Sequence, residues 1–347
     1  MRHLMSVLCC LVLLSASRTF AAEYQVGVSR IDITPQEPLR LSGYGNRTKP
    51  SEGVDTTLYA RALVLREGGG LFRVLVSVDT IGFPGDLTVD VSKLLKEKFG
   101  IAREDVVISS THSHTAPQLS NGLSNLLAVP MTADERAKSE AYTHQVRDRV
   151  VEAVGLAIKD MAPAKLSTSV GEAAFARNRR TIVDGKWMGF GENPTGAVDH
   201  TVPCVKVVAD DGKTVRAVLF NYACHCTTFG PGHNRVNGDW AGYATAELEA
   251  DHPDMLAFSI IGCGADANPD REGPRQLELA KAQGHELAVA VEKQLTARGQ
   301  VIDASLQSTF GFAGIASDRP EEADLKTQLT STQPQVRQHA ENMPATL

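Results

Sequence analysis

The amino-acid sequence predicts an α/β protein, in which helices flank mixed β-sheets packed as a sandwich and the functional site lies at the carboxyl ends of strands. Short apolar runs typical of strands alternate along the 347-residue chain with longer amphipathic stretches typical of helices. The polar residues with catalytic potential follow directly after the apolar runs. Hydrophobic residues make up 42% of the chain and charged residues 22%, which excludes a disordered or polytopic membrane protein.

The first half of the chain contains three of the predicted strands and two of the predicted helices. The segments 60–66 and 73–79 are predicted strands, joined by a glycine-rich turn at 68–70. A helix is predicted over 87–99, ending at Gly100, and a buried strand over 106–110. These are followed by a long helical pattern over 133–159, which the Met-Ala-Pro sequence at 161–163 closes.

The second half continues the alternation of strands and helices. Residues 202–209 and 214–222 predict a hairpin across an Asp-Asp-Gly turn. The following segments predict a helix over 241–250, a strand over 256–262 and a helix over 276–295. Interleaving of this kind favours an α/β sandwich over an all-α or all-β fold.

The chain ends predict three regions of different character. Residues 1–22 have a basic start, an apolar run and a small-residue junction, which indicates a secretory signal peptide; an amphipathic or core helix is the alternative. Residues 23–317 are predicted to form the catalytic domain. From about residue 318 the sequence is rich in Gln, Thr, Glu and Pro, and we expect 318–347 to be an incomplete carboxyl-terminal segment. The mature protein is therefore expected to be exported, either to the periplasm or outside the cell.

Charge and cysteine content narrow the function classes. The formal net charge is −6, so no basic surplus exists to neutralise phosphates and nucleic-acid binding is not expected. Outside the signal, the cysteines have no CxxC pair typical of a structural zinc cluster. An exported protein could pair them as disulfides, but we interpret them as core residues: Cys204, Cys224, Cys226 and Cys263.

Two histidine motifs follow predicted strands. The sequence Thr-His-Ser-His-Thr-Ala-Pro at 111–117 places His112 and His114 two residues apart in a loop, where their imidazoles can face one point. A pair of surface histidines is the alternative. His225 follows the strand predicted to end at residue 222, and on its own such a histidine is more often a hydrogen-bonded core residue than a metal ligand. Thiolate ligation by Cys224 or Cys226 is a weaker hypothesis.

Three further segments carry polar groups. Asp239 lies in a glycine-flanked turn before a predicted helix and is either a functional acid or a helix cap. Residues 262–270 form a glycine-rich turn after a buried strand, where backbone N–H groups can approach a ligand, or which is simply a tight turn. The basic cluster at 176–180 is either a solvated surface or a site for a polar substrate group.

Taken in order, these segments resemble the amino-terminal catalytic domain of the neutral/alkaline non-lysosomal ceramidases. The Thr-His-Ser-His-Thr-Ala-Pro motif is similar to the Thr-His-Thr-His-Ser-Gly-Pro of that family. The other matching segments are the opening strand and turn at 26–35, the Asn-Arg pair at 178–179, the Cys-His-Cys-Thr-Thr at 224–228, the Gly-Asp-x-x-Gly-Tyr at 238–243 and the turn before proline at 262–269. The resemblance covers about residues 24–347, and the ordered set is far more specific than any one motif.

The resemblance implies a zinc amidohydrolase that splits the N-acyl bond of ceramide or a related lipid amide. It implies that His112 and His225 are zinc ligands and that His114 lines the site. Arg179, with Asn178 beside it, would bind the polar end of the substrate. We group Asp239 and Asn268 with His114 as catalytic candidates. The expected partner is a small-molecule or lipid amide, with peripheral contact to a membrane surface; oligomeric state is not predicted.

The sequence departs from the family pattern in two respects. Asn268 stands where the resemblance implies a catalytic serine, and an amide cannot act as a hydroxyl nucleophile. The later Glu and Tyr that complete the zinc ligands in the family have no counterpart, so we expect a divergent, truncated member, or else substitution by Asp239 or His233. A second hypothesis is an exported, inactive binding module with the same fold. A third is a calcium or magnesium site formed by Asp239, Asp266 and Asp270.

Overall fold

The computed structural model describes residues 24–123, 127–272, 276–316 and 320–343, so the predicted signal peptide over 1–22 lies outside the described residues. Nine strands in this part of the chain form one sheet: β1 (Tyr24–Asp32), β2 (Tyr59–Glu67), β3 (Arg73–Val78), β4 (Val106–Ser110), β5 (Ala162–Glu172), β9 (Thr201–Ala209), β10 (Val215–Tyr222), β11 (Leu256–Ile261) and β13 (Gln300–Ile302). Their order is β11-β10-β9-β5-β1-β2-β3-β4, with β13 beside β5. The sheet is mixed, because β3–β4 and β10–β11 pair in parallel and the other pairs are antiparallel.

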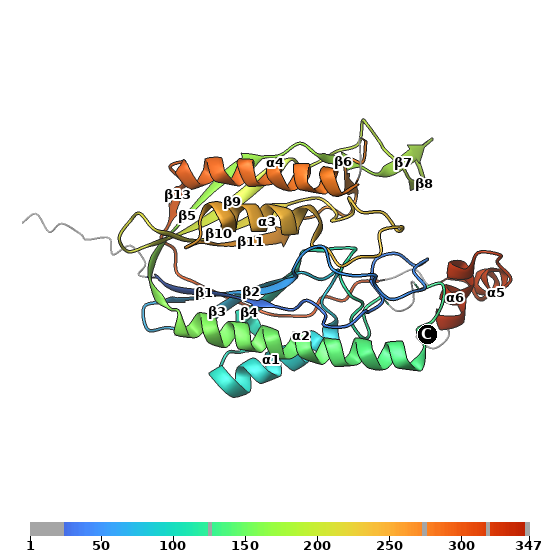
Figure 1. Cartoon of the computed structure of the whole chain (residues 1–347), viewed down its shortest axis with the longest axis horizontal. Coiled ribbons are helices and arrows are strands. Elements are labelled where there is room, and N and C mark those ends of the chain that lie inside the picture. The colour runs from blue at the N-terminus through green and yellow to red at the C-terminus, as the bar shows by residue number, and fades with distance from the viewer. Residues whose placement is uncertain (1–23, 124–126, 273–275, 317–319, 344–347) are drawn as a thin grey trace, which may run out of the picture.

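The sheet bends between β5 and β1 into two halves that pack face to face (Figure 1). Among the described residues, three pairs join the halves along this bend: Tyr24–Val26 with Ala162–Ala164. Helices cover the outer faces: α1 (Gly85–Phe99) and α2 (Ala133–Lys159) lie on the β1–β4 half, while α3 (Asp239–Asp251) and α4 (Gln276–Thr296) lie on the β5–β11 half. The predicted α/β sandwich with flanking helices is confirmed.

Three apolar clusters hold these layers together. Val26, Leu63 and Phe258 belong to the cluster between the two sheet halves. A second cluster joins α1 and α2 to β2, β3 and β4, and a third joins α3 and α4 to β9, β10 and β11. Each sheet half is therefore buried on both faces, which explains why its strands have nearly continuous apolar runs.

The predicted elements in the central part of the chain are found, with ends shifted by up to two residues. Thr132 accepts a hydrogen bond from the Glu135 backbone N–H and Glu135 bonds back to it, so a capping box begins α2. Gly100, with φ of 72°, ends α1 as predicted. Strand β5 was not predicted, because Pro163 was interpreted only as the end of α2. Pro163 lies at the bend, where it pairs with Gln25.

The remaining elements are short. Outside the main sheet, β6 (Ala176–Asn178) pairs with β12 (Ala267–Pro269), and β7 (Arg180–Val183) pairs with β8 (Lys186–Phe190). A 3₁₀ turn, η1 (Arg103–Asp105), precedes β4, and two helices, α5 (Glu322–Leu329) and α6 (Pro334–Asn342), lie beside each other after residue 320. No described helix combines the length and the apolar character needed to cross a bilayer.

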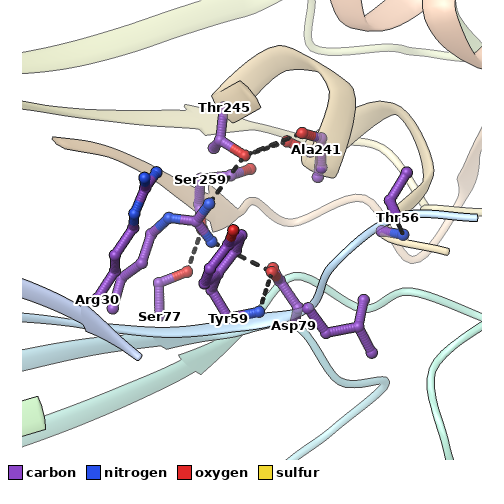
Figure 2. A network of polar contacts seen from close by, with 12 residues as sticks. Arg30, Thr56, Tyr59, Ser77, Asp79, Ala241, Thr245 and Ser259 are labelled. Atoms are coloured by element: carbon purple, nitrogen blue, oxygen red, sulfur yellow. Dashed lines mark hydrogen bonds and ion pairs between the residues drawn. The ribbon is translucent and has the colours of Figure 1, made fainter. Parts of the chain in front are cut away.

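A buried polar network ties the two halves together (Figure 2). Arg61 of β2 donates to Asp79 at 3.1 Å and to Glu249 of α3 at 3.4 Å, and it also reaches Thr245 at 3.3 Å. Arg61, Asp79 and Glu249 each have side chains no more than 6% exposed. Since Asp79 directly follows β3 and Glu249 belongs to the other half, the network fixes the position of one half relative to the other.

Candidate metal centre

Two loops from opposite halves of the sheet carry the predicted histidines to one place. His112 and His114 follow β4, and His225 follows β10, so both loops leave the carboxyl ends of strands. An isolated parallel bridge between Ser113 and Cys226 joins the loops, and the His114 backbone N–H donates to the Cys226 carbonyl at 3.2 Å. The predicted position of the site at the carboxyl ends of strands is confirmed.

The three imidazoles form a compact cluster. One ring nitrogen from each of His112, His114 and His225 lies within 4.8 Å of the other two. The Nε2 atoms of His112 and His114 are 3.3 Å apart, and the ring centroids of His112 and His225 are 4.6 Å apart. The backbone of His112 has a φ of 63°, an uncommon value for a residue with a side chain.

Backbone carbonyls orient two of the three rings. His112 Nδ1 lies 2.6 Å from the Ile81 carbonyl, and His225 Nδ1 lies 2.7 Å from the Gly264 carbonyl. Since a carbonyl oxygen can only accept, each Nδ1 carries the proton and each Nε2 presents a lone pair. This is the arrangement in which an outer hydrogen bond fixes the tautomer of a metal-binding histidine.

Burial keeps the cluster neutral. Desolvation lowers the pKa of His112, and it lowers the pKa of His225 to about 4. The pKa of His114 falls to about 2, first through desolvation and then through the neighbouring His112 and His225. All three imidazoles are therefore neutral near pH 7, and the neutral imidazole is the form that binds a metal ion.

The donor set fits a zinc-type cation. His114 Nδ1 is buried and has no hydrogen-bond partner, and the Nε2 atoms of His112 and His114 approach each other to 3.3 Å. Three neutral imidazole nitrogens converging on one point match the His₃ set of protein ligands found in catalytic zinc sites.

Arg179 and Asn268 lie beside the cluster. Arg179 donates to His225 Nε2 at 2.9 Å and to Asn268 Oδ1 at 3.1 Å, and Ala265 anchors it through its carbonyl. Asn268 Oδ1 also accepts from Thr227 at 3.1 Å. Arg179 and Asn268 line a cavity of about 350 Å³, and the three histidines are not among its lining residues. The predicted substrate-binding residue is thus positioned between the cluster and a space of ligand size.

Asn178 also lines this cavity, but its side chain forms hydrogen bonds within the protein. Its Nδ2 donates to the Ala197 carbonyl at 2.9 Å, and its Oδ1 accepts from the Arg180 backbone at 2.9 Å. These bonds shape the loop that carries Arg179, so the structure supports a positioning contribution from Asn178.

Asp239 lies apart from the histidine cluster. Its side chain is fully buried at the start of α3, and its carboxylate accepts from the Trp240 backbone at 2.7 Å. Desolvation raises the Asp239 pKa to about 6. His233 pairs with Asp55 at 2.9 Å. Among the described residues, neither Asp239 nor His233 belongs to the group of side chains that could share a metal ion.

The other predicted ligands are also dispersed. Asp266 contacts Asn178, and Asp270 pairs with Arg177 at 3.2 Å, so neither shares a site with Asp239 in the described part of the chain. The cysteines are free; Cys204, Cys224 and Cys226 are buried and Cys263 is exposed. Burial raises the pKa of the Cys224 and Cys226 thiols well above the ordinary value, which opposes thiolate ligation.

Sequence reasoning missed the residues that support the histidines. The Ile81 and Gly264 carbonyls carry no side-chain signal. Tyr44 lies with its ring centroid 5.1 Å from that of His114, and the buried Arg47 donates to the His114 carbonyl. Gly43 adopts a φ of 92° directly against the His114 ring. The segment Gly-Tyr-Gly-Asn-Arg at 43–47 was the available signal, because glycines around an aromatic residue mark a close backbone approach.

Fold and site together define an α/β sandwich protein with a three-histidine candidate metal centre at the carboxyl ends of its strands. The family model described as "Neutral/alkaline non-lysosomal ceramidase, N-terminal" matches residues 24–305. The chain belongs to this family.

Relatives agree with this assignment. Neutral ceramidase A of Dictyostelium discoideum is 26% identical over 274 residues, covering 73% of this chain and 37% of the relative. Neutral ceramidase of Drosophila melanogaster is 28% identical over 274 residues, covering 74% and 37%. The crystal structure of neutral ceramidase from Pseudomonas aeruginosa superposes with a TM-score of 0.64 at 19% identity, covering 78% and 44%, which supports the fold. The chain spans roughly two fifths of the length of these proteins.

Proposed function

We propose that this protein is an exported zinc-dependent amidohydrolase that cleaves the N-acyl bond of ceramide or a related lipid amide. The observation that carries the proposal is the convergence of three neutral imidazoles beside a cavity that Arg179 and Asn268 line. Family membership supports an amide of the ceramide type. Export rests on the signal-like sequence of residues 1–22.

His112, His114 and His225 would hold the zinc ion. When bound there, zinc would polarise the amide carbonyl and lower the pKa of a water molecule to about 7. The Ile81 and Gly264 carbonyls fix His112 and His225 with the proton on Nδ1, so each Nε2 carries a lone pair. The lone pair of His225 accepts from Arg179, which would release this bond when zinc binds. Because burial keeps the pKa of His114 near 2, His114 serves as a ligand or positioning group and not as a proton donor at neutral pH.

Arg179 is the group that would recognise the substrate. Its guanidinium lies between His225 and Asn268, at the boundary between the cluster and the cavity. A fixed cation there can donate hydrogen bonds to the oxygen of an amide or to a hydroxyl of its amine half. Asn268 Oδ1 accepts from the guanidinium, and the Thr227 hydroxyl donates to the same oxygen, so Asn268 acts here through Arg179.

The test is metal content followed by catalysis. Purified protein is dialysed, analysed for zinc and assayed with ceramides and other N-acyl amines. We expect about one zinc per chain, and we expect both His112→Ala and His225→Ala to lose most of the zinc and the hydrolysis. Matched control variants are His252→Ala and His285→Ala, whose imidazoles pair with Glu292 and Glu247 outside the cluster. Full zinc content in both cluster variants would refute the site.

Asn268 favours a second candidate function, an exported binding module without catalysis. Its amide is engaged by Arg179 and Thr227, and it cannot supply a hydroxyl nucleophile. This candidate predicts saturable binding of an N-acyl amine with no turnover, even when zinc is in excess. Zinc-dependent turnover that persists through purification and disappears in His225→Ala would exclude it.

A further inference from the structure

The β7–β8 hairpin projects from the end of the molecule beyond α4 (Figure 1). Its large apolar side chains are exposed. We name this surface the apolar hairpin. Its members are Ile182 (49% exposed), Val183 (51%), Trp187 (55%), Met188 (65%) and Phe190 (65%). Several large apolar side chains exposed on one hairpin mark an interaction site, whereas single exposed apolar residues need no explanation.

The apolar hairpin has no core of its own. Its two strands form a separate sheet in which Ile182 lies opposite Trp187 and Val183 lies opposite Lys186. Asp184 and Gly185 join the strands with φ values of 50° and 73°, as in the type I′ turn that Asp-Gly favours. The turn fixes the ribbon, but a two-stranded ribbon buries little apolar surface by itself, so these side chains need a partner.

The hairpin is continuous with the cavity beside the metal centre. Phe190 lines that cavity together with Arg179. The guanidinium carbons of Arg179 and Arg180 lie 4.7 and 5.4 Å from the centroid of the Phe190 ring. A partner seated on the hairpin would therefore lie at the entrance to the substrate cavity.

The composition of the hairpin indicates which partner it fits. Trp187 and Phe190 are side chains favoured at the boundary between water and hydrocarbon. Arg180 and Lys186 flank them in a protein whose net charge is −6, so the local cations suit an anionic lipid headgroup. A lipid amide, the substrate class proposed above, is held in a lipid surface and must be taken from it.

We propose that the apolar hairpin inserts into a lipid surface and thereby places the cavity of Arg179 over substrate in the bilayer. This inference rests on the proposed function for its purpose, but lipid binding itself requires no catalysis. The inserted side chains are Trp187, Met188 and Ile182, and Phe190 connects the hairpin to the cavity.

The two tryptophans of the chain make the insertion measurable. Trp187 is 55% exposed and Trp240 is 1% exposed, so a change in the polarity around the hairpin is reported by Trp187. On addition of phosphatidylcholine vesicles containing phosphatidylglycerol, we expect a blue shift of the emission and quenching by brominated lipid. Trp187→Phe should remove the signal while binding by vesicle flotation persists.

The binding of variants to vesicles tests whether the apolar hairpin is the lipid contact. Trp187→Ser/Met188→Ser should weaken flotation with vesicles by at least about tenfold, since two large apolar groups no longer enter the lipid. Leu71→Ser is the matched control, because Leu71 is 66% exposed in the turn between β2 and β3; it should leave partitioning unchanged. The double variant should also lose hydrolysis of amides in vesicles while keeping hydrolysis of a water-soluble short-chain amide.

Two results would overturn the proposal. Unchanged flotation of the double variant would show that the hairpin is not the lipid contact. A blue shift that depends on protein concentration in the absence of vesicles, with dimers in sedimentation, would show that a second copy covers the hairpin. A chain that floats with vesicles but cleaves no amide would refute the proposed hydrolysis and leave the lipid contact standing.

Discussion

Gly43 determines how closely the backbone approaches His114. Its φ is 92°, and a Cβ atom at this position would lie 2.5 Å from His114 Nδ1. That ring nitrogen is buried and has no hydrogen-bond partner, so packing against Gly43 and the contact of Nε2 with His112 Nε2 orient the ring. The candidate site was predictable to the extent that its chemistry lies in side chains such as those of His112, His225 and Arg179. Gly43 and the supporting carbonyls could not be predicted, because their contribution depends on distances that only the folded chain sets.

Gly43→Ala should weaken zinc binding. The added methyl group must displace the His114 ring, and disturbing the surroundings of a ligand typically costs about 10–100-fold in metal affinity. Gly212→Ala is the control: its φ is 71°, yet no atom lies within 4 Å of the added methyl group. It should cost about 1–2 kcal/mol of stability with no change in zinc affinity. Titration against a chromophoric chelator measures the zinc affinity of both variants. Equal affinities of Gly43→Ala and Gly212→Ala would contradict the packing argument.

Asp239→Asn should stabilise the protein at neutral pH. Burial raises the Asp239 pKa to about 6, so the folded state holds this proton more tightly than the unfolded state, where the pKa is near 3.9. The favourable contribution of Asp239 is complete below about pH 3.9 and is lost as the pH rises through 6. We therefore expect Asp239→Asn to gain up to about 3 kcal/mol at pH 7 and little at pH 4.

Urea unfolding of both proteins at pH 4 and pH 7 measures this difference. Asp211→Asn is the control, because Asp211 lies in the exposed turn between β9 and β10, where hydrogen bonds from Thr214 and the backbone lower the pKa of its carboxyl group to about 2. Asp211→Asn should not raise the free energy of unfolding at pH 7. A loss of stability in Asp239→Asn at pH 7 would mean that the buried carboxylate is ionised and favourably bonded there.

Among the helices and strands, the spacing of apolar residues predicted an element correctly wherever one spacing, helical or strand-like, held throughout the segment. The long amphipathic run that became α2 and the apolar run that became β10 are both found close to their predicted ends. Strand β5 was missed because Pro163 marks both the end of α2 and the bend of the sheet. The β7–β8 hairpin was missed although Asp184-Gly185 between two apolar runs is a strong hairpin signal. Its apolar residues are exposed and belong to no hydrophobic core, so a pattern chosen to find buried strands does not detect them.

Arg61→Met should strongly destabilise the packing of α3 against the first half of the sheet. The substitution leaves Asp79 buried without its cation, while Glu249 keeps its pair with the more exposed Arg30. Breaking one partner of a buried ion pair costs about 3–5 kcal/mol. Lys138→Met is the control, because the Lys138–Asp134 pair is exposed and screened by solvent, so its loss should leave the free energy of unfolding nearly unchanged. Denaturant unfolding measures the free energy of both, and similar values would show that the network does not hold the halves together.

For the whole molecule, the candidate metal centre lies where the two halves meet. In the part of the chain that the structure describes, three residue pairs connect the halves along the sheet at the bend, and the buried network of Arg61 adds a second attachment. The loop bridge from Ser113 to Cys226 adds a third attachment, at the site itself. Because His112 and His114 come from one half and His225 from the other, an ion held by all three would resist their separation.

Zinc should therefore stabilise the molecule as a whole. A ligand that binds only the folded state adds about 2.7 kcal/mol to the free energy of unfolding when its free concentration is a hundred times Kd. Hydrogen exchange should slow together in the loops 111–117 and 223–228, because each loop contributes a ligand. In His225→Ala both effects should disappear, and in His252→Ala both should remain. Slower exchange confined to the 111–117 loop in the unaltered protein would mean that one half alone holds the ion.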